Sequence, residues 1–263
     1  MAEAGNPVTP SHELLEWPKQ DKRRFLHAVY RVGDLERTIK FYTECLGMKL
    51  LRKRDVPEEK YANAFLVYEI MKDHNIGTMK VATADIKTKG GTITREPGPV
   101  KGGSTVIAFA KDPDGYLFEL IQRGPTPEPL CQVMLRVGDL ERSIKFYEKA
   151  LGMRLLKKTD RPEQKYTIAM MGYADEYETT VLELTYNYGV TEYTKGTAYA
   201  QIVTQELGGK ITREPGPVPG INTKITSFLD PDGWKTSHLV SSNVARAKLS
   251  LVLVDHEDFL KEL

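Results

Sequence analysis

The sequence predicts an α+β fold, with helices on one side of a curved sheet, built as two tandem copies of one domain. Three observations support this prediction. The chain repeats itself, each copy opens with a strand, a helix and a second strand, and each copy carries a later apolar stretch with the turn sequence DPDG. A length of 263 residues accommodates two domains of roughly 100 to 130 residues each.

The repeat is visible by direct comparison. HAVYRVGDLERTIKFYTECLGMKLLRK begins at His27, and QVMLRVGDLERSIKFYEKALGMRLLKK begins at Gln132, an offset of 105 residues. ITREPGPV and DPDG recur farther on with an offset of 118 residues, so the first copy is 13 residues shorter between positions 61 and 93. A period this long indicates duplicated domains and excludes a solenoid.

Local patterns predict the elements of each copy in order. HAVYRV alternates as a strand does, DLERTIKFYTECLG is an amphipathic helix with Asp34 as N-cap and Gly47 just past its end, and MKLLRK is a second strand. NAFLVYE in the first copy, with TIAMMGYA and TTVLELTY in the second, follow as strands. STVIAFAKDPDGYLFELIQ is a hairpin with its turn at Asp112 to Gly115.

These patterns set the expected domain boundaries. Residues 1–23 form a tail, 24–123 a first domain that is internally shortened, and 124–130 a proline-rich linker. Residues 131–263 form a second domain, shortened after Gln201 and carrying an insertion near 236–250 that interrupts its last strand.

Composition narrows the function classes. Lys and Arg number 37 and Asp and Glu 36, a balance that favours neither nucleic acid nor a membrane surface as partner. Two cysteines form no disulfide framework or CxxC site, and no signal-peptide or membrane-spanning stretch is found. We expect a cytoplasmic protein that acts on a small molecule or another protein.

Four polar residues interrupt apolar strands, where burial without a partner is costly. They are Glu119, Glu183, Gln132 and His27. Any one alone is more readily explained as an edge position that faces water. However, His27 and Gln132 occupy equivalent positions in the repeat. Carboxylate, amide and imidazole donors without a thiolate suit a hard or borderline divalent ion in an open site.

The quoted segments, together with VLELTYNYGV and ITREPGPVKGGSTVIAFAKDPDGYLFELI, resemble glyoxalase I in its single-chain, two-domain plant form, from about Leu26 to the end of the chain. The resemblance implies four βαβββ modules of the glyoxalase/dihydroxybiphenyl dioxygenase type, paired in two domains, of which two are shortened here. It also implies one Ni²⁺ or Zn²⁺ ion, and glutathione and methylglyoxal as substrates. In this family their hemithioacetal is isomerised to lactoylglutathione.

Carried over by position, the resemblance makes Gln132, Glu183 and Glu119 the metal ligands. Glu119 and Glu183 are the catalytic carboxylates, and Glu119 is the base that removes the proton next to the carbonyl. Arg136, Asn187 and Lys101 are expected to hold glutathione. A second, vestigial site keeps His27 and Gln201 but has Ser237 where a carboxylate is expected.

One ligand of the expected active site is missing. The family's histidine falls in the shortened stretch VYEIMKDHNIGTMKVATADIKTKGG, near Met71, and a role for His74 is disfavoured because single-histidine signals are weak. We therefore predict reduced or absent activity in this form. The alternative is a non-catalytic small-molecule binder or an inactive splice-type variant of the same fold. A ring-cleaving dioxygenase ranks last because Gln132 stands where that chemistry uses histidine. A monomer is expected, because the covalent duplication internalises a dimer interface.

Overall fold

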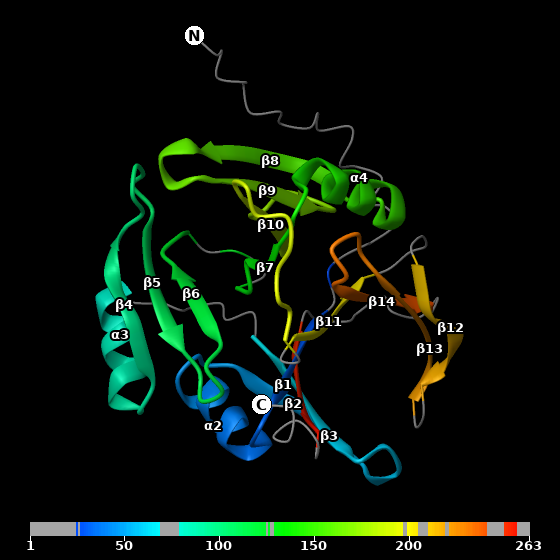
Figure 1. Cartoon of the computed structure of the whole chain (residues 1–263). Helices are drawn as coiled ribbons and strands as arrows, with labels where there is room; N and C mark the ends of the chain where they lie inside the picture. The colour runs from blue at the N-terminus through cyan, green and yellow to red at the C-terminus, as the bar shows by residue number, and fades with distance from the viewer. Residues whose placement is uncertain are drawn as a thin grey trace. The chain divides into compact units, whose positions relative to one another are not determined.

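The computed structural model of the chain describes residues 25, 27–68, 79–124, 126, 129–196, 199–204, 210–218, 221–240 and 250–256 (Figure 1). Side chains are described for these except at 59, 200–204, 210–218, 221–226, 238–240 and 250–256. The chain divides into two compact units. Unit 1 comprises 1–28 and 130–249, and unit 2 comprises 29–129 and 250–263, so the boundary falls inside the first strand.

Unit 1 opens with a four-stranded sheet in the order β7-β10-β9-β8. Its strands are β7 (Gln132–Arg136), β8 (Arg154–Arg161), β9 (Tyr166–Gly172) and β10 (Val181–Asn187). Strands β7 and β10 pair in parallel, whereas β10 with β9 and β9 with β8 pair antiparallel. The 3-10 turn η2 (Pro162–Gln164) joins β8 to β9 and ends at Lys165 in the left-handed conformation, with a φ of 60°.

Helix α4 (Leu140–Leu151) covers one face of this sheet, against β8, β9 and β10 (Figure 1). Asp139 caps it by accepting a hydrogen bond from the amide of Arg142, and Gly152 ends it with a φ of 64°. Its apolar residues recur at helical spacing, so a single stripe is buried; the buried side chains include Leu140, Ile144, Tyr147 and Leu151.

The remainder of unit 1 is a second four-stranded set in the order β11-β14-β13-β12. These strands are β11 (Tyr199–Thr204), β12 (Lys210–Val218), β13 (Ile221–Leu229) and β14 (Lys235–Val240). The pattern repeats that of the first sheet, with β11 and β14 parallel. Strand β14 runs from Lys235 to Val240 and so includes the first residues of the expected insertion, whose remaining part up to 249 lies outside the described residues.

Unit 2 repeats the first sheet of unit 1 in the order β1-β15-β3-β2. It contains β1 (His27–Val32), β2 (Lys49–Val56), β3 (Tyr61–Val67) and, from the far end of the chain, β15 (Ser250–His256). The turn η1 (Pro57–Glu59) joins β2 to β3, as η2 does in unit 1. Helix α2 (Leu35–Glu44) packs on β2, β3 and β15, and Asp34 is its N-cap as predicted.

The second part of unit 2 is a three-stranded sheet in the order β4-β5-β6, covered by helix α3 (Met79–Thr88) (Figure 1). Its strands are β4 (Thr92–Pro99), β5 (Val106–Lys111) and β6 (Leu117–Ile121). The predicted hairpin is confirmed, because β5 and β6 pair antiparallel across the turn that contains Asp112 to Gly115.

The contact grouping differs from the sequence interpretation at the C-terminus. Residues 250–263 were assigned to the second domain, whereas the structure groups them with unit 2. The physical reason is the pairing of β15 with β3, a ladder that no segment close to β3 in sequence supplies among the described residues. The remaining predicted boundaries stay predictions.

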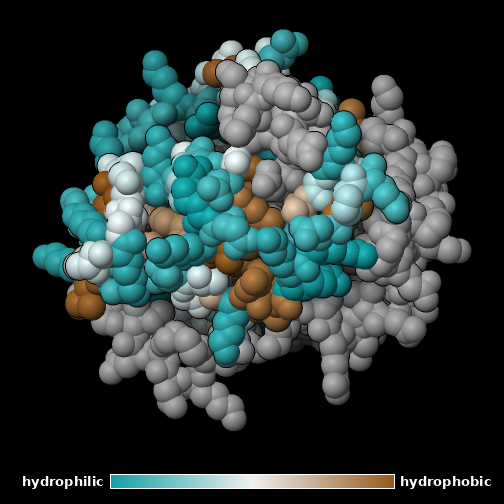
Figure 2. Space-filling model, turned by 90° about the horizontal axis from the view of Figure 1, so that it is seen from below, coloured by the Kyte–Doolittle hydropathy of each residue, from teal (hydrophilic) through white to brown (hydrophobic). Residues whose placement is uncertain are grey.

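The surface is mixed in polarity. On the face in Figure 2, hydrophilic residues cover most of the described surface and hydrophobic residues reach it in a few groups. The most exposed large apolar side chains are those of Leu117, Leu51 and Val81. Among the helices that the structure describes, none is both long and apolar enough to cross a membrane.

Candidate metal and substrate site

The candidate site lies on the face of the β7-β10-β9-β8 sheet that α4 does not cover, which we call the open face. Side chains alternate along a strand, and β7 buries Val133 and Leu135 while Gln132, Met134 and Arg136 are half-buried or exposed. Glu183 is the register partner of Met134 on β10, so its side chain lies on the same face. The sheet therefore places Gln132 and Glu183, predicted as ligands from the sequence, next to each other.

The two side chains are in direct contact. The Gln132 amide donates a hydrogen bond to Oε2 of Glu183, and Thr185 Oγ1 donates to Oε1 at 2.9 Å. Glu183 is only 9% exposed. A buried carboxylate needs such donors, because desolvation of an unpartnered charge is costly. Thr185 was not singled out from the sequence, although its position two residues after Glu183 places it on the same face.

Arg136 and Asn187, predicted to bind glutathione, extend the same face toward the far ends of β7 and β10. Arg136 is exposed and is the register partner of Thr185, and Asn187 is the last residue of β10. The Asn187 amide donates to the hydroxyl of Tyr193 at 2.9 Å, so a loop residue that the sequence did not single out orients it.

Glu119 belongs to unit 2, on β6. Its side chain is exposed, and β6 is an edge strand of its sheet. Neighbouring atoms still desolvate the carboxyl enough to raise its pKa, while the nearby charge of Arg95 lowers it. Arg95 and Glu119 are both register partners of Phe109, and this proximity was not foreseen from ITREPGPV. The relation of Glu119 to Gln132 and Glu183 stays a prediction.

The other predicted residues are placed individually. Lys101 is exposed in the turn between β4 and β5, and His27 is half-buried at the start of β1. Gln201 lies on β11, but its side chain is outside the described residues. Met71 and His74 also lie outside them.

Ser237 stands on β14 opposite Ser227, where Glu119 stands opposite Phe109 in the first copy. The two serine hydroxyls are buried and hydrogen-bonded to each other at 2.7 Å. Ser237, which stands where a carboxylate was expected, is therefore engaged by Ser227, a residue that the sequence did not single out.

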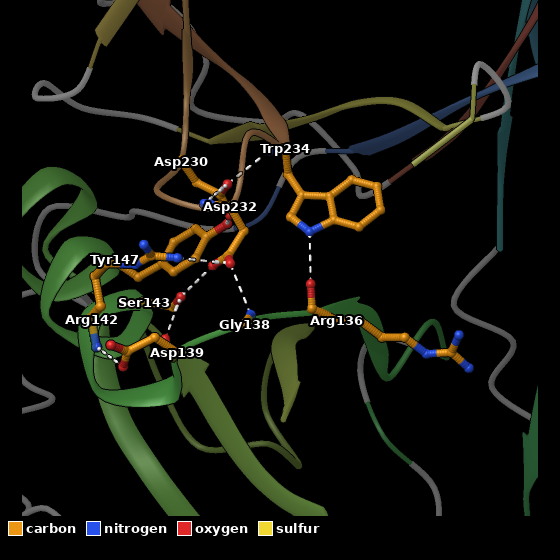
Figure 3. Close-up of polar contacts among 9 residues, drawn as sticks. All are labelled: Arg136, Gly138, Asp139, Arg142, Ser143, Tyr147, Asp230, Asp232 and Trp234. Carbon is orange, nitrogen blue, oxygen red and sulfur yellow. Dashed lines mark hydrogen bonds and ion pairs between the residues drawn. The ribbon is translucent and has the colours of Figure 1, made fainter. Parts of the chain in front are cut away.

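A polar network supports each copy beside its sheet, and Figure 3 shows the network of unit 1. In unit 1, Asp232 accepts hydrogen bonds from the Gly138 amide at 2.8 Å, from Ser143 Oγ at 2.7 Å and from the Arg142 guanidinium at 2.9 Å. Its carboxylate therefore lies at the N-terminus of α4, where the helix dipole favours negative charge. Asp114 makes the corresponding bonds to Gly33, Thr38 and Arg37 in unit 2.

The first aspartate of each DPDG turn is buried against a tyrosine. Tyr147 donates to Asp230 at 2.8 Å, and Tyr42 donates to Asp112 at 2.9 Å. Burial raises the pKa of Asp230 to about 6, although hydrogen bonds from Tyr147 and the Trp234 amide act in the opposite direction. The sequence identified DPDG only as a turn, because nothing local indicates which helix the turn contacts.

The network also fixes the strand that carries Arg136. The Trp234 indole donates to the backbone carbonyl of Arg136 at 2.9 Å, and the Arg136 guanidinium extends away from that contact (Figure 3). Tyr116 donates in the same way to the carbonyl of Arg31 in unit 2. In each copy the residue after DPDG therefore anchors the first strand.

The donor chemistry of the pair on unit 1 fits a divalent metal ion. Gln132 and Glu183 supply an amide and a carboxylate, which are oxygen ligands for hard or borderline ions. Within the part of the chain that the structure describes, no three His, Cys, Asp or Glu side chains are grouped closely enough to hold a metal. The pair by itself therefore supplies two donors, one amide and one carboxylate.

Comparison with known proteins identifies relatives over nearly the whole chain. The family model for the glyoxalase/bleomycin resistance protein/dioxygenase superfamily matches residues 24–76, 74–120 and 130–207. The chain is 62% identical over 297 residues to a lactoylglutathione lyase of Arabidopsis thaliana, which covers 97% of this chain and 100% of the relative. It is 61% identical over 305 residues to a lactoylglutathione lyase of Oryza sativa subsp. japonica, with all of both chains covered.

A solved structure agrees. The crystal structure of glyoxalase I from Zea mays matches with a TM-score of 0.76 at 61% identity, over 94% of this chain and 97% of the maize chain. Identity of this level over nearly the full length, together with the repeated sheet pattern, shows that the chain belongs to the glyoxalase superfamily and, within it, to the two-domain lactoylglutathione lyases (glyoxalase I) of the plant type.

Proposed function

We propose that the chain is a metal-dependent lactoylglutathione lyase with one metal site, which converts the hemithioacetal of methylglyoxal and glutathione to lactoylglutathione and so removes methylglyoxal. The observation that carries the proposal is the contact between Gln132 and Glu183 on the open face of unit 1. This contact occurs in a chain that is 62% identical to a lactoylglutathione lyase.

The ligands proposed for a Ni²⁺ or Zn²⁺ ion are Gln132, Glu183 and Glu119. Such an ion, when bound, acts as a Lewis acid that stabilises negative charge developing on the substrate oxygens. Thr185 holds one oxygen of Glu183 and leaves the carboxylate in a fixed orientation. A fixed orientation matters because ligand geometry controls metal affinity.

Glu119 is the proposed base. Its carboxylate takes the proton from the substrate carbon next to the carbonyl, and the resulting carboxylic acid returns a proton to the neighbouring carbon, so the reaction is an isomerisation. Desolvation raises the pKa of Glu119, and a carboxylate with a raised pKa binds a proton more strongly. Arg95 acts against this shift and keeps the group ionised over a wider pH range.

The glutathione part of the substrate is assigned to Arg136 and Asn187. An arginine suits a carboxylate, because its guanidinium can donate two parallel hydrogen bonds. The Asn187 amide nitrogen is engaged by Tyr193, which leaves its oxygen oriented to accept from a peptide amide. Lys101 is a third proposed contact, from an exposed turn.

We expect turnover below that of complete relatives. The alignment to the rice enzyme spans 305 residues although this chain has 263, so it contains positions at which this chain has no residue. The histidine expected on the first strand of the second module would lie in the shortened stretch of the first copy, near Met71. Loss of one ligand of four is expected to weaken metal binding at least about tenfold, by analogy with losses of supporting residues.

The test measures hemithioacetal isomerisation by the nickel-loaded chain, its Glu119→Gln variant and the rice relative. We expect the wild-type chain to be slower than the relative, and Glu119→Gln to lose at least about 100-fold of the remaining rate, within the range for general-base catalysis. Ser237→Ala is the matched control, because Ser237 occupies the equivalent position in the second copy and has no proposed role in chemistry.

Two results would count against the proposal. Undiminished turnover by Glu119→Gln would remove that residue from the base role. A rate equal to the rice enzyme would show that the missing ligand is of no consequence. A chain with no stoichiometric metal and no turnover would instead support a non-catalytic binder of the same fold.

A further inference from the structure

Each copy contains four neighbouring strands in the same spatial arrangement. The strand in the second position comes from a different part of the chain in each copy. In unit 1 this strand is β10, which follows β9 directly in sequence. The first copy has no described strand between β3 and α3, in the stretch where it is shorter. The position between β1 and β3 is occupied by β15, from the C-terminal end of the chain.

The pairing of β15 reproduces that of β10 residue by residue. Leu182, Glu183 and Leu184 of β10 stand opposite Met171, Met170 and Ala169 of β9. Their counterparts on β15, which are Leu251, Val252 and Leu253, stand opposite Leu66, Phe65 and Ala64 of β3. Each of these β3 residues is 105 positions before its β9 equivalent, so the two ladders have the same register and direction.

The use of β15 in this position keeps apolar residues in register with the buried residues of β3. Residues directly opposite each other in an antiparallel pair share a face of the sheet. Leu251 and Leu253 stand in register with Leu66 and Ala64, both of which are fully buried. Helix α2 packs on β3 and on β15. In unit 1, Leu182 and Leu184 occupy the equivalent positions and are also fully buried.

The use of β15 in place of a β10 equivalent does not preserve the carboxylate proposed as a metal ligand. Val252 occupies the register position that Glu183 has in unit 1. A valine offers no donor atom, so this strand restores the core of unit 2 without restoring a carboxylate there.

We infer that residues 250–256 act as a donor strand: the position between β1 and β3 of unit 2 is an interaction surface, and its occupant is this C-terminal strand of the same chain. Without this strand, β3 would present an unpaired edge and α2 would lose its packing against β15. Unpaired edges promote aggregation. Unit 2 therefore depends on the last residues of the chain, whereas the β7-β10-β9-β8 sheet of unit 1 does not.

Paired cysteines in the full chain test the register. Directly opposite pairs alternate between two Cα spacings, so Val252→Cys with Phe65→Cys and Leu253→Cys with Ala64→Cys are both examined under mild oxidation. We expect at least one pair to form a disulfide within a single chain. The out-of-register control, Val252→Cys with Asn63→Cys, and the wild-type chain with Cys45 and Cys131 should form none. Disulfides only between chains, or none at the two opposite pairs, would overturn the assignment.

Hydrogen exchange in Leu253→Asp tests the dependence of unit 2 on the strand, and β9 serves as an internal control. We expect amides of β3 to exchange at least about tenfold faster, while those of β9, the repeat equivalent, keep their wild-type rates. If Leu253→Asp unfolds both units, Leu253→Ala replaces it. Unchanged exchange in β3, or equal acceleration in β3 and β9, would contradict the inference. Neither experiment uses catalysis, so the result is independent of the proposed activity.

Discussion

At the scale of single residues, the repeated aspartate and tyrosine pairs separate structural carboxylates from functional ones. Asp112 and Asp230 are each buried against a tyrosine hydroxyl, and each accepts backbone amides from its own turn. Glu183 instead shares its oxygens with side chains on an open sheet face. Because the aspartate–tyrosine pair recurs in both copies, it is best explained by a role in folding. Glu183 does not recur, because Val252 occupies its equivalent position in the other copy.

Asp230 should impose a pH dependence on stability. Its pKa rises from 3.8 to about 6 on folding, so the folded state binds the proton more tightly than the unfolded state. Stability from this group is fully present below about pH 4 and is lost as the pH rises toward 6, a change on the order of 2 to 3 kcal/mol. Urea unfolding from pH 4 to 8 should show a shallower dependence in Asp230→Asn. Identical slopes in wild type and variant would contradict this expectation.

Individual site residues were predictable from the sequence to a limited extent. Gln132 and Glu183 interrupt apolar strands of a recognisable repeat, and the structure brings them together. Thr185, Arg95 and Tyr193 were not identified, because their contacts depend on sheet register and on a loop conformation. Glu119 interrupts an apolar strand in the same way, but the sequence alone does not reveal that β6 is an edge strand on which Glu119 is exposed.

At the scale of elements, the regular spacing of apolar residues predicted both capped helices and the strands next to them. The N-cap Asp34 was visible because an aspartate precedes an amphipathic stretch, and Asp139 is its repeat equivalent in the structure. The position of β15 was not predictable, because SLVLVDH carries the same alternation whichever sheet it joins. Only the register against β3 determines which copy it completes.

The joint between β7 and α4 yields a second prediction. A Cβ on Gly138 would lie 1.9 Å from the carbonyl oxygen of Thr191, which is backbone and has little freedom to move aside. Gly138→Ala should therefore destabilise the chain by about 1 to 3 kcal/mol, as overpacking does. It should also raise the KM for the hemithioacetal, because the displaced loop carries Tyr193, the partner of Asn187.

Gly98→Ala is the control for this prediction, because a Cβ there meets nothing within 4 Å. Denaturant unfolding should place it within about 0.5 kcal/mol of wild type. An equal loss of stability in the two variants would mean that the close approach at Gly138 has no special cost.

At the scale of the whole molecule, the duplication gives two copies of one scaffold with unequal sets of donors. One copy has Gln132 with Glu183 on neighbouring strands. In the first copy, His27 begins β1 while Val252 occupies the carboxylate position. In the second copy, Ser237 stands at the position equivalent to Glu119 and is hydrogen-bonded to Ser227. The sequence revealed the duplication and most of this asymmetry. It did not reveal that a strand from the end of the chain repairs the shortened copy.

The central claim is that the chain binds one metal ion through Glu183 and no second ion at the vestigial site of His27, Gln201 and Ser237. Metal content per chain, measured after nickel loading and removal of free ion, tests it most directly for the wild type, Glu183→Ala and Ser237→Ala. We predict one ion per chain in the wild type and in Ser237→Ala, and loss of that ion in Glu183→Ala. Two ions per wild-type chain, or an ion retained at full occupancy in Glu183→Ala, would contradict the claim.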